Sequence, residues 1–293
     1  MAGNQKIGVY TLHTFDLANP SPAEQAAMLK QAVALSLSGF GLVMLASMHV
    51  HDDGSIYFND TPMISSNPSA PSGQLSPNLP QCLGNIASTS TVLASFGGGG
   101  LFKGKAVSYW DFSAIKTLIA QYPDPATNPF FQNLLCMFKT YPQIRGIDID
   151  LECYDPGTDY QLFTSTLLTI IKWLGSKGYA CTLCPFNYPD FWVDLIGQAG
   201  GAGQFAWINL QNASDTASEF VQPLRGAGVG IDRIVGGLQV GGQGEQQYVT
   251  ESFKGLVQQY PGIGGGWLWN LDSFGVANAA SYASALAKGL AGG

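Results

Sequence analysis

Acidic and apolar residues alternate in the stretch Arg145-Gly146-Ile147-Asp148-Ile149-Asp150-Leu151-Glu152. Successive side chains of a β-strand point to opposite faces of the sheet. A strand here places its apolar side chains on one face and three carboxyl groups on the other; the apolar residues are Ile147, Ile149 and Leu151, and the acids are Asp148, Asp150 and Glu152. The alternation therefore predicts a strand with one buried apolar face and one acidic face.

The acidic face of this strand predicts a functional site. Buried carboxylates need hydrogen-bond partners or protons, and like charges two residues apart raise the pKa of at least one of them. The alternative interpretation is a solvated strand face or an ion-pair network. No Lys, Arg or His stands between Arg145 and Lys172 to neutralise the acids locally, which weighs against that alternative. The pattern favours a protonated carboxyl beside an ionised one, as acid–base catalysis requires.

Length and composition limit the fold and the partners. A chain of 293 residues can form two ordinary domains or one α/β barrel, which commonly takes about 250 residues. The hydrophobic content of 46% supplies a large core, whereas charged residues make up only 11%. The net charge of −7 argues against a nucleic acid partner, because phosphates would be repelled. A neutral ligand suits this composition better.

The sequence contains no clear signal for membrane insertion or for export. No apolar run approaches the roughly 18 residues of a membrane span, so no membrane partner is expected. The segment Met1–Lys6 contains no apolar signal core before the first predicted strand. Because a signal can be cleaved, the compartment stays open, with secretion weakly favoured.

The cysteines and histidines predict neither a disulfide framework nor a metal site. Five widely spaced cysteines do not form the dense, even pattern of small secreted proteins. Cys181 and Cys184 form a CxxC motif, but on a strand they face opposite sides. His13, His49 and His51 follow the first two predicted strands, and a metal site that includes Asp52 is conceivable. Histidines on such loops more often form hydrogen bonds or stack, so no metal or cofactor is predicted.

Eight short apolar runs, most of them followed by a helical pattern, indicate the fold. Strands that alternate with helices form parallel sheets, and eight such units suggest closure into a barrel. We therefore predict an α/β fold, a single (β/α)8 TIM barrel, over residues 1–293 as one catalytic domain with its site at the carboxyl ends of the strands. The predicted strands are Lys6–Leu12, Gly41–Ser47, Thr91–Ser95, Ile144–Glu152, Tyr179–Phe186, Phe205–Gln211, Arg233–Val240 and Gly264–Asn270.

Three local patterns add detail. Ser21-Pro22-Ala23-Glu24 predicts a helix start with a capping box. Asp53-Gly54 predicts a hairpin turn. The Pro-, Ser- and Asn-rich segment Asn59–Pro80 is typical of a long surface loop, which we expect to form part of a cleft wall. After the acidic strand, a helix is expected from about Thr158 to Lys177.

The acidic strand resembles the Asp-Gly-x-Asp-x-Asp-x-Glu signature of glycoside hydrolase family 18, which contains chitinases and endo-β-N-acetylglucosaminidases. Gly146, Asp148, Asp150 and Glu152 match the signature, whereas Arg145 stands where the family has its first Asp. The resemblance implies a (β/α)8 barrel that hydrolyses β-linked N-acetylglucosamine glycans with retention.

Further motifs extend the resemblance along the chain. Ser95-Phe96-Gly97-Gly98 resembles the family's Ser-x-Gly-Gly motif on the third strand, and Cys184-Pro185-Phe186 is similar to the Ala-Pro-Gln stretch of plant-type chitinases. Trp269 matches the tryptophan on which the central sugar ring lies, where an aromatic face supplies binding energy. Because Trp267 shares its parity on the strand, we expect only one of the two at the rim.

The sixth predicted strand departs from the family pattern. Asn209 and Gln211 occupy positions where the family has Gln or Met and then Tyr, so the tyrosine that contacts the substrate's N-acetyl group is replaced. Gln211 can still donate an amide N–H to an acetamido carbonyl. The expected substrate-binding residues are Trp269, Gln211, Asn209, Tyr10, Ser95, Gly97 and Gly98.

The resemblance implies roles for the three acids. Glu152 is expected to be the general acid, and Asp150 to hold the substrate's acetamido group, whose oxygen is the nucleophile in this family. Asp148 is expected to share a proton with Asp150. The expected partner is an oligosaccharide or polysaccharide that contains N-acetylglucosamine, bound by a monomer without cofactor or metal.

Two other functions fit the same residues. An endo-β-N-acetylglucosaminidase acting on N-glycan cores would differ from a chitinase mainly in its loops. A non-catalytic, chitinase-like lectin on the same fold typically lacks the acid; Glu152 argues against it, and Gln211 argues mildly for it.

Overall fold

The parallel strands of the protein close into a barrel, seen in a computed structural model that describes residues 5–65, 75–153, 155–211 and 213–292. Each barrel strand pairs in parallel with its two neighbours, and the pairing of the first with the second completes the ring. Around the ring the strands are β1 (Lys6–Thr11), β2 (Leu42–Val50), β5 (Thr91–Gly97), β8 (Ile144–Asp150), β9 (Ala180–Leu183), β10 (Ile208–Leu210), β11 (Ile234–Gln239) and β12 (Gly265–Trp269). The predicted (β/α)8 barrel is confirmed.

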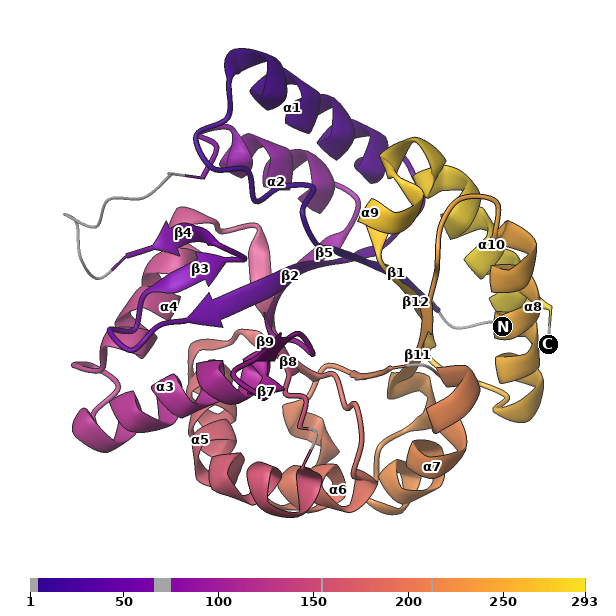
Figure 1. The fold of residues 1–293 in the computed structure, drawn as a ribbon. Helices are drawn as coiled ribbons and strands as arrows, with labels where there is room; N and C mark the ends of the chain where they lie inside the picture. Colours follow the sequence, from indigo (N-terminus) through magenta and orange to yellow (C-terminus); the bar gives the residue numbers. More distant parts are fainter. Residues whose placement is uncertain (1–4, 66–74, 154, 212, 293) are drawn as a thin grey trace.

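Helices form an outer layer around the barrel, as Figure 1 shows in a view along its axis. They connect successive strands, which is why all the strands can run parallel. The helices are α1 (Pro22–Ser36), α2 (Leu79–Ala87), α3 (Val107–Gln121), α4 (Pro129–Thr140), α5 (Pro156–Lys177), α6 (Pro189–Gln198), α7 (Ala213–Gly226), α8 (Gln246–Gln259), α9 (Leu271–Phe274) and α10 (Ala279–Ala291). Among the described residues, no helix is both long enough and apolar enough to cross a membrane.

Two separate cores stabilise the barrel. The larger one lies between strands and helices and includes Ile147, Ile149 and Leu151, which confirms the predicted apolar face of the acidic strand. The smaller one fills the barrel interior, with Tyr10 and Trp267 among its members. The acids of β8 therefore point into the barrel, because their strand neighbours occupy the outer core.

Most local patterns formed as predicted. Ser21 and Glu24 make a reciprocal capping box at the start of α1. Gly54, with a positive φ of 83°, lies in the turn between β2 and the antiparallel strand β3 (Ile56–Phe58). Cys181 packs in the outer core and Cys184 in the inner one, so the CxxC residues face opposite sides.

The prediction that Asn59–Pro80 forms one long loop was wrong. It contains the strand β4 (Thr61–Ile64), which extends the sheet antiparallel to β3, and the start of α2; residues 66–74 lie outside the described residues. Alternation over so short a strand is too brief to detect among Pro, Ser and Asn. The short hairpin strands β6 (Leu101–Phe102) and β7 (Lys105–Ala106) and the helix α4 were not predicted either.

Candidate active site

The carboxyl ends of the strands surround a cavity of about 590 Å³, the size of a typical small-molecule site. Asp150 and Glu152 line it together with Tyr10, Gln211 and Trp269. Gly97 and Gly98 line it as well. Ser95 and Asn209, which were expected to bind substrate, are absent from its lining. They lie one layer deeper in the barrel, where both contact Asp148.

Asp148 is fully buried at the centre of a hydrogen-bond network. Tyr10 and Ser95 donate their hydroxyls to Oδ2 at 2.7 and 3.0 Å. Thr182 Oγ1 and Asn209 Nδ2 donate to Oδ1 at 2.5 and 3.0 Å. Burial raises the pKa of Asp148, and these four hydrogen bonds oppose the rise. Donors from four strands thus satisfy this carboxylate, and a proton shared with Asp150 stays a prediction.

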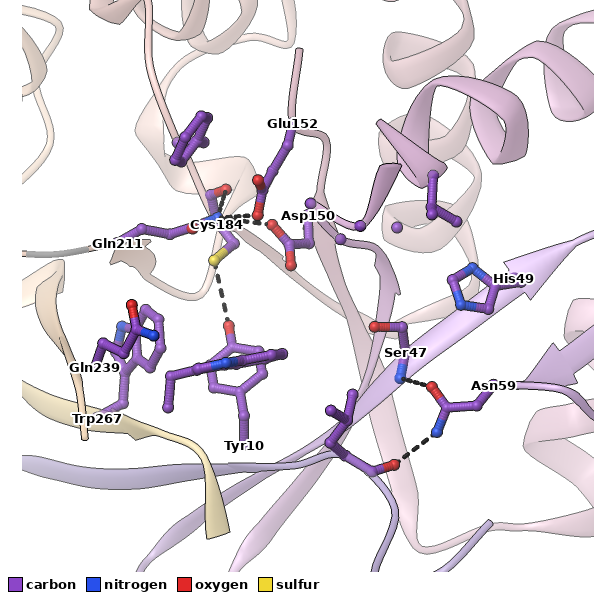
Figure 2. Close-up of a pocket in the computed structure, with 18 of the residues that line it drawn as sticks. Tyr10, Ser47, His49, Asn59, Asp150, Glu152, Cys184, Gln211, Gln239 and Trp267 are labelled. Carbon is purple, nitrogen blue, oxygen red and sulfur yellow. Dashed lines mark hydrogen bonds between the residues drawn. The ribbon is translucent and has the colours of Figure 1, made fainter. Parts of the chain in front are cut away.

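Gln211 joins the other two acids (Figure 2). Its amide nitrogen lies 2.8 Å from Asp150 Oδ1 and 3.1 Å from Glu152 Oε1, and it also donates to the carbonyl of Cys184 at 3.4 Å. Both carboxyls are buried. Gln211, at the position where the resembled family has a tyrosine, therefore bridges Asp150 and Glu152.

The environment of this pair favours protonated carboxyls. Burial first, and then the charges of Glu152 and Asp148, raise the pKa of Asp150 well above its ordinary value. Burial also raises the pKa of Glu152. Hydrogen bonds from Gln211 oppose both increases, and the Cys184 thiol opposes that of Asp150. A carboxyl that holds a proton near neutrality can act as a general acid.

Two residues from the segment after β5 position Glu152. The Ser108 hydroxyl accepts from the backbone N–H of Glu152 at 3.0 Å and donates to its carbonyl at 2.9 Å. A Cβ atom on Gly99 would lie only 2.1 Å from Glu152 Oε2. Only glycine leaves room for the acid there.

Glycine is also required two residues earlier, at the end of β5. Gly97 has a φ of +110°, and a Cβ on it would lie 2.2 Å from the backbone oxygen of Asp150. Gly98 donates its N–H to that same oxygen at 2.9 Å. The predicted glycine motif therefore allows β5 to lie tightly against the end of β8.

Aromatic side chains form another wall. The Tyr10 ring lies 4.5 Å from the Trp267 ring and 5.5 Å from the Trp269 ring, centroid to centroid. Trp269 is partly exposed at the end of β12, whereas Trp267 is buried with no hydrogen-bond partner recorded for its indole nitrogen in the described structure. Both rings line the cavity, Trp269 as the partly exposed one and Trp267 as the buried one.

The histidines take separate positions. His13 and His49 line the cavity and pair with Asp16 and Asp111 at 2.8 and 3.0 Å. His51 stacks on Tyr57. His49 lies within β2, because that strand runs three residues further than predicted. Within the described ranges, no three His, Cys, Asp or Glu residues are grouped to hold a metal ion.

Several residues of the site were not anticipated. Cys184, Thr182, Ser47, Asn59 and Gln239 line the cavity or contact its acids. Strand alternation could have indicated Thr182, because it shares the inward face with Cys184. Ser47 and Asn59 lie across the cavity from Gln211 in Figure 2, joined by a hydrogen bond from the Ser47 N–H to Asn59 Oδ1 at 3.1 Å. The sequence carried no signal for this contact, which depends on the fold of β3.

Comparison with known proteins finds similarity in fold alone. No protein-family description and no curated protein matches the sequence. Among solved structures, a Group IV chitinase from Ostrinia furnacalis superposes with a TM-score of 0.60 at 11% identity, over 98% of this chain and 100% of the other. The spore cortex-lytic enzyme SleL of Bacillus megaterium gives 0.60 at 13%, over 96% and 74%.

A third solved structure carries a sugar ligand. The GH18 chitinase from Cycas revoluta, in complex with (GlcNAc)3, gives a TM-score of 0.53 at 13% identity, over 89% of this chain and 96% of the other. The sequence motifs and the fold thus both resemble those of family 18 chitinases. The protein has the barrel fold of these chitinases and of the cortex-lytic enzyme.

Proposed function

We propose that the protein is a family 18 glycoside hydrolase that cleaves β-1,4-linked N-acetylglucosamine glycans with retention, through substrate assistance. The observation that carries this proposal is the pair Asp150 and Glu152, buried side by side in the cavity and bridged by the amide of Gln211. A partly exposed tryptophan beside this pair, Trp269, offers a face for a sugar ring. The whole chain would act as one catalytic unit.

The first step would break the glycosidic bond. Glu152 donates its proton to the leaving glycosidic oxygen while the substrate's acetamido oxygen attacks the anomeric carbon. Asp150 accepts a hydrogen bond from the acetamido N–H and offsets the positive charge of the resulting oxazolinium ion. The amide of Gln211 carries two N–H donors, so one can turn to the acetamido oxygen while the other stays on a carboxylate.

The second step would release the product. Glu152, now ionised, takes a proton from water, and the hydroxide adds to the anomeric carbon as the bond to the acetamido oxygen breaks. Because each step inverts the anomeric carbon, the product retains the original configuration. Asp148, held by its four donors, would stay fixed beneath Asp150 throughout.

A turnover assay on three substrates tests the proposal. We expect chitooligosaccharides to be cleaved and cellooligosaccharides to be inert, because the latter carry a hydroxyl where the nucleophilic acetamido group should be. Comparable cleavage of cellooligosaccharides, or a glycosyl ester trapped on an Asp or Glu, would rule out substrate assistance. Preferential cleavage of a high-mannose glycopeptide would favour an endo-β-N-acetylglucosaminidase.

The lectin remains the second candidate because of Gln211. If Gln211 cannot replace the family's tyrosine, the protein would bind chitooligosaccharides without turnover. Binding of a chitooligosaccharide by calorimetry, together with no release of reducing ends, would support the lectin and exclude the hydrolase.

A further inference from the structure

A thiol lies beside the catalytic carboxyls and has no role in the mechanism above. Cys184 follows β9, and its backbone N–H donates to the carbonyl of Ile149 at 2.8 Å, which places it next to Asp150 on the neighbouring strand. Its side chain is 1% exposed, packs in the inner core and lines the cavity. The plant-type chitinases that the sequence resembles here have alanine at this position, so the resemblance does not explain the thiol.

The hydrogen bonds around Cys184 direct its own hydrogen to Asp150. The Tyr10 hydroxyl lies 2.7 Å from Asp148 Oδ2 and also donates to Cys184 Sγ at 3.4 Å, the contact drawn in Figure 2. A sulfur that accepts there still has its S–H to donate, and Asp150 is the carboxyl that receives it. Burial, and then the charges of Asp150 and Asp148, keep the pKa of the thiol well above its ordinary value, so it holds this hydrogen at neutral pH.

The thiol distinguishes between the two carboxyls of the catalytic pair. The amide of Gln211 donates to both Asp150 and Glu152, whereas the thiol of Cys184 donates, among the described residues, to Asp150 and not to Glu152. The proposed first step needs the proton on Glu152 and a charge on Asp150. Burial opposes this arrangement, because it raises the pKa of Asp150. A donor to the ionised form of one carboxyl favours the proton on the other.

We propose that Cys184 is a positioning residue, which donates its thiol hydrogen to ionised Asp150 and thereby leaves the proton of the pair on Glu152. The inference rests on the proposed function and adds to it a residue that acts through Asp150. The thiol forms no bond to the substrate and stays protonated throughout. Because a thiol is a weak donor, its effect should be smaller than that of the Gln211 amide.

The other ionisable groups of the cavity stay the same when Cys184 is replaced. Those that face Asp150 are Asp148 and Glu152 from its own strand and the segment after it, and Tyr10 from β1. The remaining ones are His13 and His49, which pair with Asp16 and Asp111. In the pH profile of kcat/KM, the acid limb therefore reports the ionisation of Asp150, and the alkaline limb reports the loss of the proton from Glu152.

This pH profile, measured with chitooligosaccharides, tests the inference. Cys184→Ala removes a donor to ionised Asp150, so the pKa of Asp150 should rise and the acid limb should move to higher pH by about half a pH unit. The alkaline limb should stay in place, in contrast to Gln211→Leu, which alters both carboxyls. Cys184→Ser supplies a hydroxyl donor and should keep the acid limb at or below its native position.

A second cysteine on the same strand provides the matched control. Cys181 packs in the outer core, so Cys181→Ala removes a thiol from β9 without touching the carboxyl pair and should leave both limbs in place. An unmoved acid limb in Cys184→Ala, or equal movement of both limbs, would overturn the inference. So would a lower kcat/KM at every pH with an unchanged profile, because that result assigns Cys184 to packing alone.

Infrared spectroscopy of the S–H stretch gives a readout that needs no turnover. The S–H band lies in a spectral window free of other protein groups and moves to lower frequency when the thiol donates more strongly. The component that is lost in Cys184→Ala belongs to Cys184. We expect this component to move to lower frequency as Asp150 ionises with rising pH, and to stay in place in Asp150→Asn. A component that responds to neither pH nor Asp150→Asn would refute the contact.

Failure of the proposed function gives a different set of results. A protein that cleaves no chitooligosaccharide, yet shows the pH-dependent S–H band, would lose the proposed function and the catalytic role of Cys184 with it, while the contact to Asp150 stands. A protein that cleaves chitotriose with the same pH profile in its native and Cys184→Ala forms keeps its function and loses only this inference.

Discussion

At the scale of single residues, one amide supports two acids. Gln211 donates to Asp150 and Glu152 from one nitrogen, so the two carboxyls share a donor that the family's tyrosine hydroxyl could give to only one of them at a time. Both carboxyls have raised pKa values, and Gln211 is among the groups that hold them down. A glutamine at the position where the resembled family has tyrosine therefore changes the electrostatics of Asp150 and Glu152.

Replacing the acid itself gives the first prediction. Glu152→Gln should reduce kcat by about 10²- to 10⁴-fold, because the amide cannot donate the proton that the leaving oxygen needs. Binding of chitotriose should persist. Steady-state kinetics measure the loss, and Glu251→Gln, on the exposed side of α8, is the control that should behave like the native protein. Activity within a few-fold of native would remove Glu152 from the mechanism.

Gln211 gives the second prediction. Gln211→Leu removes a donor that lowers both carboxyl pKa values, so both limbs of the pH profile of kcat/KM should move to higher pH. The loss of an electrostatic donor should also reduce kcat about 10²-fold. Gln211→Tyr restores a hydroxyl donor and should keep or raise activity. An unmoved pH profile in Gln211→Leu would show that the bridge does not control the pair.

At the scale of secondary-structure elements, the end of β5 is fitted to the end of β8. Gly97 leaves space for the backbone of Asp150, and Gly99 leaves space for the carboxyl of Glu152. Ser108, at the start of α3, binds the backbone of Glu152 on the same side. The acid is thus positioned by a neighbouring strand and helix, beyond what its own strand determines.

A methyl group added at Gly99 gives the third prediction. Gly99→Ala should leave the fold intact, because the nearest atoms to the new Cβ are the movable carboxyl of Glu152. The displaced acid should lower kcat at least about tenfold, since small misplacements of catalytic groups are costly. Gly197→Ala in α6, where the new Cβ meets nothing within 4 Å, is the control. Kinetics and circular dichroism on both variants separate displacement from unfolding.

The sequence could predict those secondary-structure elements whose apolar or alternating pattern extends over several residues. The eight barrel strands followed from short apolar runs, and the inward face of β8 followed from alternation, because a two-residue period over seven residues is a strong signal. The hairpin of β6 and β7 has two residues in each strand, too few for any period. The amide bridge of Gln211 depends on the spacing between β8 and β10, which no local pattern encodes.

At the scale of the whole molecule, the site lowers stability near neutral pH. The pKa values of Asp148, Asp150 and Glu152 are all raised by burial, so folding favours their protonated forms. A carboxyl group whose pKa is higher in the folded chain than in the unfolded chain stabilises the fold at pH values below its pKa in the unfolded chain. This stabilisation is lost as the pH rises through its pKa in the folded chain.

Removing one of these charges gives the fourth prediction. Asp150→Asn should raise the melting temperature at pH 7.5, because an amide has no charge to desolvate or to repel Glu152. At about pH 4, near the ordinary pKa of a carboxyl, the difference from the native protein should shrink. Turnover should fall at both pH values, since an amide cannot offset the oxazolinium charge. Scanning calorimetry measures the temperatures; a lower melting temperature of Asp150→Asn at pH 7.5 would contradict the argument.

The four donors to Asp148 also constrain how the chain can fold. Tyr10 comes from β1, Ser95 from β5, Thr182 from β9 and Asn209 from β10, so the network joins segments up to about two hundred residues apart in the sequence. A folding intermediate that contains only β1 to β8 supplies Asp148 with two of its four donors, Tyr10 and Ser95. The carboxylate of Asp148 is then fully shielded from water only after the ring of strands closes. Recovery of activity during refolding should therefore coincide with the last, slowest rise in amide protection of the barrel strands, since the site cannot form before the ring does.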